Sequence, residues 1–312
     1  MRSIVLGGAG FIGSHLVDRL LARGDEVVAV DSFITGRRDN AQRNRDNARY
    51  SLLEHDICKP LPSLGRADLI FNLASPASPV DYAKLPLETL EAGSTGTRNA
   101  LKLARAVGAT LVHASTSEVY GDPLEHPQRE EYFGNVNPIG PRACYDEAKR
   151  FAEALITSWG RVHGTPFRLA RIFNTYGPRM RVDDGRVVPA FVTQALRGEE
   201  FTVFGDGTQT RSFCYVDDLV SGLIALAERG DARPVNLGNP YEMTLIEFAE
   251  TIRKVLGKGG AIRSTRPLPE NDPQQRRPDI TRARTLLGWE PRVPLEEGLV
   301  PTARWFQQEL GL

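Results

Sequence analysis

Several features are scarce or missing in this sequence of 312 residues, and each excludes a class of protein. The three cysteines, Cys58, Cys144 and Cys214, form no CxxC pair and lie in no histidine cluster, which argues against a disulfide framework and against a bound metal. No apolar run reaches about 18 residues, so we expect no membrane span. The 39 basic and 39 acidic residues cancel, and this zero net charge gives no sign of binding to nucleic acid or to a membrane surface.

Signals for export and for two common hydrolytic mechanisms are also missing. The first predicted strand starts at residue 3, so we expect no signal peptide and, with so few cysteines, a cytoplasmic location. The sequence contains no GxSxG nucleophile elbow and no HExxH zinc motif. The chemistry must therefore come from other motifs.

What is present is an alternation of short β-branched runs with helical patterns. The predicted strands cover residues 3–6, 26–30, 68–73, 110–114 and 167–172. Helical periodicity separates them, first at residues 11–22. Continuous apolar strands between helices are typical of a parallel sheet that is covered on both faces. We therefore predict an α/β fold with a Rossmann-type, doubly wound parallel sheet.

Past residue 176 glycine and proline become more frequent, which indicates a change of organisation. Helical patterns continue at residues 187–197, 216–229, 244–256 and 295–308. We predict a nucleotide-binding domain at residues 1–176, to which about 212–240 return, and a smaller mixed α/β substrate-binding domain at 177–312.

A glycine-rich segment joins the first predicted strand to the first predicted helix. It fits GxGxxG from Gly8 and GxxGxxG from Gly7. Without side chains, backbone amides can approach a pyrophosphate, whose charge a helix N-terminus favours. The expected cofactor contacts in this segment are Gly7, Gly10, Phe11, Ile12 and Gly13.

An acid follows at the distance that a dinucleotide site requires. Asp31 ends the second predicted strand, where a carboxylate would hold the adenosine ribose hydroxyls and repel a 2′-phosphate. This favours NAD over NADP, although Arg37 and Arg38 follow closely and could accommodate a phosphate. Asp56, after a third strand, is either an adenine contact or a solvated loop acid.

A tyrosine and a lysine four residues apart point to catalysis. Tyr145 and Lys149 lie on one face of a predicted helix, where the lysine is expected to lower the pKa of the phenol and make it a general base. A predicted strand ends shortly before them at Thr116, and strand ends at one edge of a parallel sheet are where ligands bind.

With these motifs the chain resembles the extended short-chain dehydrogenase/reductase superfamily, and within it the UDP-glucuronate decarboxylases (UDP-xylose synthases). The segments that carry the resemblance are residues 72–79, 115–123, 134–140, 171–180, 205–213 and 276–279. The resemblance implies a homodimer and a catalytic NAD. It also implies that the sugar is oxidised at carbon 4, loses carbon dioxide from carbon 5 as a β-keto acid, and is reduced again.

The resemblance also assigns roles to residues. The expected catalytic residues are Thr116, Ser117, Glu118, Tyr145 and Lys149. Further cofactor contacts are expected at Thr35, Gly36, Asp56, Ile57, Leu73 and Ala74, and from Tyr145 and Lys149. Substrate contacts are expected at Pro76, Glu118, Asn174, Val188, Thr202, Phe204, Arg211, and Arg276 or its neighbour Arg277.

Related reactions remain alternatives. A 4,6-dehydratase or 4-epimerase acting on a UDP- or dTDP-hexose would use the same scaffold, and a catalytically silent dinucleotide-binding protein is a third hypothesis. Dehydratases of this superfamily typically carry an acid at the position of Ser117, and a serine is a poor proton donor. The dimer is expected to pair helices near residues 88–107 and 142–163, with Leu101, Leu103, Leu155 and Ile156 as candidate contacts or as core.

Overall fold

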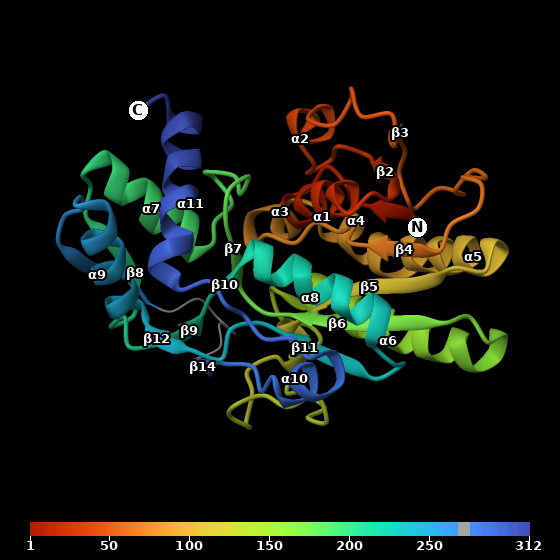
Figure 1. Ribbon diagram of the computed structural model, residues 1–312. Helices are drawn as coiled ribbons and strands as arrows, with labels where there is room; N and C mark the ends of the chain where they lie inside the picture. Colours follow the sequence, from red (N-terminus) through yellow and green to blue (C-terminus); the bar gives the residue numbers. More distant parts are fainter. Residues whose placement is uncertain (268–274) are drawn as a thin grey trace.

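The computed structural model describes residues 1–267 and 275–312, and its centre is a seven-stranded parallel sheet (Figure 1). The strand order is β11-β6-β5-β4-β1-β2-β3, so the winding direction reverses between β1 and β4. The strands are β1 (Arg2–Leu6), β2 (Glu26–Asp31), β3 (Tyr50–Glu54), β4 (Leu69–Asn72), β5 (Thr110–Thr116), β6 (Phe167–Ile172) and β11 (Pro234–Leu237). This confirms the predicted fold class.

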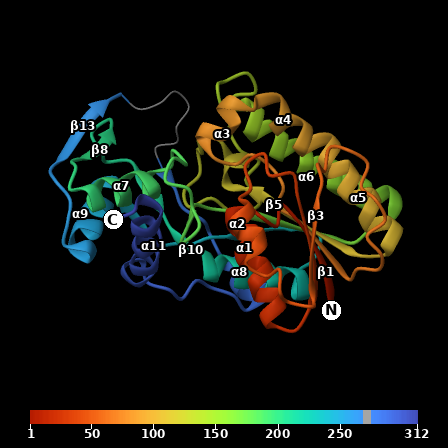
Figure 2. The ribbon, with the colours of Figure 1, turned by 90° about the horizontal axis from the view of Figure 1, so that it is seen from above.

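Helices cover both faces of the sheet, as Figure 2 shows with the sheet between two layers. One layer holds α1 (Phe11–Ala22) and α8 (Val216–Arg229). The other holds α4 (Pro86–Glu91), α5 (Thr97–Val107) and α6 (Ala143–His163), with a short π-helix at Ala92–Gly96 between α4 and α5. Side chains alternate along β1: Val5 packs toward α1, whereas Ile4 and Leu6 pack toward α5 and α6.

Three of the four proposed dimer contacts belong to the core. Leu101, Leu103 and Ile156 are buried against the sheet, which leaves Leu155 half-buried. The large apolar side chains that α4 and α6 expose are Leu87 (70%), Leu90 (40%), Phe151 (47%) and, near the end of α6, Val162 (73%).

The rest of the chain forms a smaller lobe beside the sheet, on the left in Figure 1. Its helices are α7 (Val187–Arg197), α9 (Leu245–Leu256) and α11 (Leu295–Leu310). Its strands are β8 (Phe201–Phe204), β9 (Thr210–Ser212), β12 (Glu242–Thr244), β13 (Ile262–Arg266) and β14 (Gln275–Arg276). The remaining elements are α2 (Arg38–Gln42), α3 (Pro79–Lys84), a 3-10 turn at Ser117–Tyr120, β7 (Thr175–Tyr176), β10 (Cys214–Tyr215) and α10 (Thr281–Leu287).

The chain crosses between the two lobes more than once. After α7, β8 and β9 it returns to the sheet as β11, which pairs with β6, and then leaves again for β12 and α9. Within the described residues, no helix is both long and apolar enough to cross a membrane.

Candidate active site

A cavity of ≈ 830 Å³ lies where the sheet meets the smaller lobe. It is lined by residues that follow the carboxyl ends of β1, β4 and β5, on either side of the point where the winding reverses. Ligands of doubly wound sheets bind at this place. Eight cationic side chains and three carboxylates are among its described lining, so the cavity is basic although the chain is neutral.

The glycine segment forms one end of this cavity. Gly7 has φ +80°, and a Cβ atom on Gly13 would lie 2.0 Å from the Gly7 carbonyl oxygen, so the tight turn requires glycine at both positions. Gly10 caps α1 without a side chain, which leaves the first amides of the helix open to the cavity. This cradle fits a pyrophosphate.

Asp31 lies behind the glycine segment and is buried. Its carboxylate accepts hydrogen bonds from the amides of Ala9 and Phe33, both at 2.9 Å. Burial raises the pKa of Asp31 above its ordinary value. Gly36 packs against this carboxylate so closely that a Cβ atom there would lie 2.5 Å from Oδ1.

Tyr145 and Lys149 project from the first turns of α6 into the cavity. The lysine Nζ donates to the Ala114 carbonyl at 2.8 Å and lies 5.8 Å from the centroid of the tyrosine ring. The Tyr145 ring stacks on Tyr82 at 5.2 Å. A hydrogen bond with the side chain of Thr116 lowers the pKa of the Tyr145 phenol.

The expected fall in the pKa of Tyr145 is wrong for this structure. Burial raises the pKa of Tyr145 to about 12, and the negative charge of Glu118 adds to the effect. Burial also lowers the pKa of Lys149 to about 8. The physical reason is that the Lys149 ammonium group bonds to the Ala114 carbonyl and not to the phenol of Tyr145. Burial, which disfavours the charged phenolate, therefore determines the direction of the pKa shift.

Glu118 is held between two arginines from distant parts of the chain. Arg276 donates to both carboxylate oxygens, with Nη2 2.8 Å from Oε2, and Arg142 donates from Nη2 to Oε2. Although burial opposes ionisation, the two arginines together lower the pKa of Glu118 to about 2. Glu118 is therefore a carboxylate at neutral pH.

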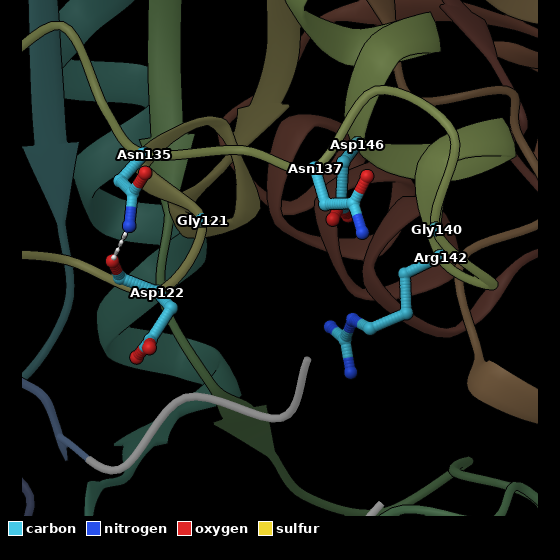
Figure 3. A pocket seen from close by; sticks show the side chains of 7 residues that line it. All are labelled: Gly121, Asp122, Asn135, Asn137, Gly140, Arg142 and Asp146. Atoms are coloured by element: carbon cyan, nitrogen blue, oxygen red, sulfur yellow. Dashed lines mark hydrogen bonds between the residues drawn. The ribbon is translucent and has the colours of Figure 1, made fainter. Parts of the chain in front are cut away.

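A second pocket, of only ≈ 20 Å³, shares Arg142 with the large cavity (Figure 3). Asn137 and Asp146 point toward the same space in this pocket. Asp146 is 6% exposed, and its Oδ1 has no hydrogen-bond partner among the described residues. Burial, together with the charge of Glu118, raises the pKa of Asp146 to about 7. A volume of this size admits a single water molecule.

The structure brings most of the predicted site residues together. The predicted residues that line the large cavity are Gly7, Gly10, Phe11, Ile12, Gly13, Thr35, Leu73, Thr116, Ser117, Glu118, Tyr145, Lys149, Asn174, Val188, Thr202, Phe204, Arg211 and Arg276. Those absent from its described lining are Asp31, Gly36, Asp56, Ile57, Ala74, Pro76 and Arg277.

The structure separates two residues that the sequence left as alternatives. Arg276 lines the cavity and is 4% exposed, whereas Arg277 bonds through its backbone to the side chain of Gln128 at 2.9 Å. Asp56 accepts a hydrogen bond from the amide of Cys58 at 2.9 Å.

Sequence reasoning missed four arginines of the cavity, of which Arg181 is paired with Asp81 at 2.7 Å. Arg142 precedes Tyr145 by one helical turn, and this spacing could have indicated it. Arg179 has φ +71° and a buried Nη1 without a partner among the described residues. Arg186, paired with Asp184 at 2.7 Å, acts electrostatically on Tyr145. Among the residues described, no group of three or more His, Cys, Asp or Glu side chains could hold a metal ion.

Known proteins resemble the chain over nearly its whole length. UDP-glucuronic acid decarboxylase 5 of Arabidopsis thaliana is 52% identical over 313 residues, which covers 100% of this chain and 91% of the relative. UDP-glucuronic acid decarboxylase 1 of Xenopus tropicalis is 53% identical over 309 residues, covering 99% and 73% respectively.

Solved structures share the fold at lower identity. A UDP-glucose 4-epimerase of Thermotoga maritima with UDP-glucose has a TM-score of 0.91 at 31% identity, with 99% of this chain and 100% of that chain covered. A UDP-glucuronic acid 4-epimerase of Bacillus cereus, in complex with UDP-glucuronic acid and NAD, has a TM-score of 0.88 at 29% identity and the same coverage. The model of the NAD dependent epimerase/dehydratase family matches residues 3–238. The chain therefore belongs to the NAD dependent epimerase/dehydratase family, and within it to the family of the UDP-glucuronic acid decarboxylases.

Proposed function

We propose that the protein is an NAD-dependent carboxy-lyase that converts UDP-glucuronate to UDP-xylose through a 4-keto intermediate. The observation that carries the proposal is the identity of about half of all residues to UDP-glucuronic acid decarboxylases over the full chain. The basic cavity that joins a pyrophosphate cradle to a buried tyrosine and lysine supports it.

The chain's own residues suit the first step, the removal of a proton from the 4-hydroxyl of the sugar. Tyr145 is the general base, and Thr116 hydrogen-bonds at the same place. NAD would supply a reversible hydride acceptor for carbon 4 and a positive charge that favours the phenolate of Tyr145. The amides at the start of α1 would hold the pyrophosphate, Asp31 would hold the adenosine ribose, and Lys149 would hold the nicotinamide ribose.

For the loss of carbon dioxide, cationic side chains must position the sugar carboxylate. The 4-ketone makes the substrate a β-keto acid, so the electrons released at carbon 5 delocalise into the ketone. We assign the carboxylate and diphosphate to the arginines of the cavity, among them Arg142, Arg211 and Arg276, because guanidinium groups bind such anions in a bidentate manner. Glu118 holds two of these arginines in place.

Ser117 and the release of carbon dioxide distinguish the proposed reaction from its alternatives. Ser117 is buried and carries no carboxyl group to protonate a leaving hydroxyl, which argues against a 4,6-dehydratase. A 4-epimerase remains the second candidate because of its close structural likeness, but epimerisation releases no carbon dioxide.

The purified protein is expected to release carbon dioxide from UDP-glucuronate without net formation of NADH. Mass spectrometry of the products from a panel of UDP- and dTDP-sugars checks this and identifies the nucleotide. Tyr145→Phe is expected to lower the rate at least about 100-fold while NAD binding is retained. Turnover of UDP-glucose or dTDP-glucose, but not of UDP-glucuronate, would overturn the proposal.

We also propose that the protein is a cytoplasmic homodimer. The cysteines Cys58, Cys144 and Cys214 are all free, which suits a reducing compartment. The exposed Leu87, Leu90 and Phe151 on the packed helices α4 and α6 suit a self-complementary helical interface. Light scattering should give twice the chain mass for the wild type, and Phe151→Glu should give a folded monomer. If the variant is still a dimer, the interface does not lie on this surface.

A further inference from the structure

The C-terminal helix α11 reaches the cofactor end of the cavity through one ion pair. Arg37 donates from both terminal nitrogens to Glu309: Nη2 lies 3.2 Å from Oε1, and Nη1 contacts Oε2. The guanidinium group also lies 5.6 Å from the centre of the Trp305 ring. The two side chains are only 25% and 23% exposed, so water screens this pair less than most surface pairs.

Arg37 lies beside the acid that we assign to the adenosine ribose. Its amide donates to the Ala9 carbonyl at 3.1 Å, and the Ala9 amide donates to Asp31 at 2.9 Å. Gly36, the residue before Arg37, packs directly on the Asp31 carboxylate. Arg37 itself lines the cavity. It is therefore placed to bind a phosphate on the 2′-oxygen of that ribose.

We propose that Glu309 is a specificity-determining residue for NAD over NADP. It occupies the guanidinium group that a 2′-phosphate would otherwise use, and it adds a negative charge beside the one that Asp31 supplies. This inference rests on the proposed use of NAD.

Arg38 is a weaker candidate for the same role. It pairs with both oxygens of Glu54 at 2.9 and 2.7 Å, but the two side chains are 59% and 56% exposed, and Arg38 is not in the described lining of the cavity. An exposed pair of this kind contributes little.

The helix itself does not need Glu309. A carboxylate in the last turn opposes the helix dipole, and α11 has no basic residue in that turn. The helix is anchored instead by the buried Leu299, Ala303 and Phe306. Replacement of Glu309 by glutamine should therefore leave the fold intact.

The test is equilibrium competition of NADP against labelled NAD on the purified full-length chain, which gives the ratio of the two affinities directly. In Glu309→Gln this ratio is expected to shift toward NADP by about fivefold to tenfold, because a nearby anion is removed and Arg37 keeps only a 3.5 Å contact with Asp39, which is 79% exposed. Glu297→Gln makes the same charge change at an exposed position of α11 and should leave the ratio unchanged. The double variant Arg37→Gln/Glu309→Gln should lose the gain.

An unchanged ratio in Glu309→Gln, or a gain that persists without Arg37, would overturn the inference. Carbon dioxide release measured on the same samples tests the proposed function separately. A wild type that prefers NAD but releases no carbon dioxide would contradict the decarboxylase and leave the Glu309 inference standing.

Discussion

At the scale of single residues, the site contains carboxyl groups whose pKa values are shifted in opposite directions by their surroundings. Glu118 is kept ionised by Arg142 and Arg276, whereas its neighbour Asp146 lacks such a partner on one oxygen and has a pKa raised to about 7. Buried groups with separated pKa values are typical of catalytic sites. Keeping such groups buried lowers the stability of the folded protein.

Asp146→Asn is expected to make the protein more stable at pH 8 and to leave its stability unchanged near pH 4. The pKa of Asp146 is about 7 in the folded chain and near 3.8 when unfolded, so the protonated form favours the fold and this contribution is lost as the pH rises toward 7. The difference between these two pKa values corresponds to about 4 kcal/mol at most, so we expect a gain of about 2–4 kcal/mol at pH 8 by denaturant unfolding. Asp122→Asn, an exposed carboxylate of the same pocket, should stay within about 0.5 kcal/mol of wild type at both pH values. Equal effects of the two variants would contradict the explanation.

At the scale of elements, the parts that depend on local sequence were the ones that could be predicted. The glycine turn, α1 and the Tyr145–Lys149 pair follow from short motifs, because their geometry is set within a turn or a helix. Arg186 was missed because only the packing of the smaller lobe on the sheet brings it to that cavity. Arg142, by contrast, lies at the start of the Tyr145 helix, and its spacing from Tyr145 could have indicated it. The direction of the pKa shift of Tyr145 could not be predicted either, because it depends on burial by residues far apart in the chain.

The turn before α1 provides a test at this scale. Gly13→Ala would place a Cβ atom 2.0 Å from the Gly7 carbonyl oxygen, so the turn must shift, and we expect a loss of about 1–3 kcal/mol in the free energy of unfolding. NAD binding should weaken in parallel, as calorimetry can measure. Gly10→Ala is the matched control for stability, because its Cβ would meet nothing nearer than 3.3 Å. If Gly13→Ala unfolded like wild type, the close approach would be refuted.

At the scale of the whole molecule, a neutral chain encloses a basic cavity. The formal net charge is zero, yet cationic side chains outnumber carboxylates in the described lining of that cavity. Attraction of an anionic substrate is therefore local, and salt should act on binding more than on folding.

The dissociation constant for UDP-glucuronate should accordingly rise several-fold between about 50 mM and about 500 mM salt, because cavity charges are screened. UDP-xylose, which lacks the carboxylate, should show a smaller rise in the same calorimetric titration. The midpoint of thermal unfolding should change little over this range. Identical salt dependence for the two ligands would mean that the cavity does not bind the carboxylate by charge.

The path of the chain between the lobes also fixes the order in which the parts appear during synthesis. The last strand of the central sheet is β11, which ends at Leu237, and the glycine turn lies at the very start of the chain. Arg276 and Glu309 leave the ribosome only later. Domains fold as the chain emerges from the ribosome. A nascent protein can therefore complete its nucleotide-binding cradle before Arg276, assigned to the substrate, and Glu309, assigned to cofactor specificity, have been synthesised.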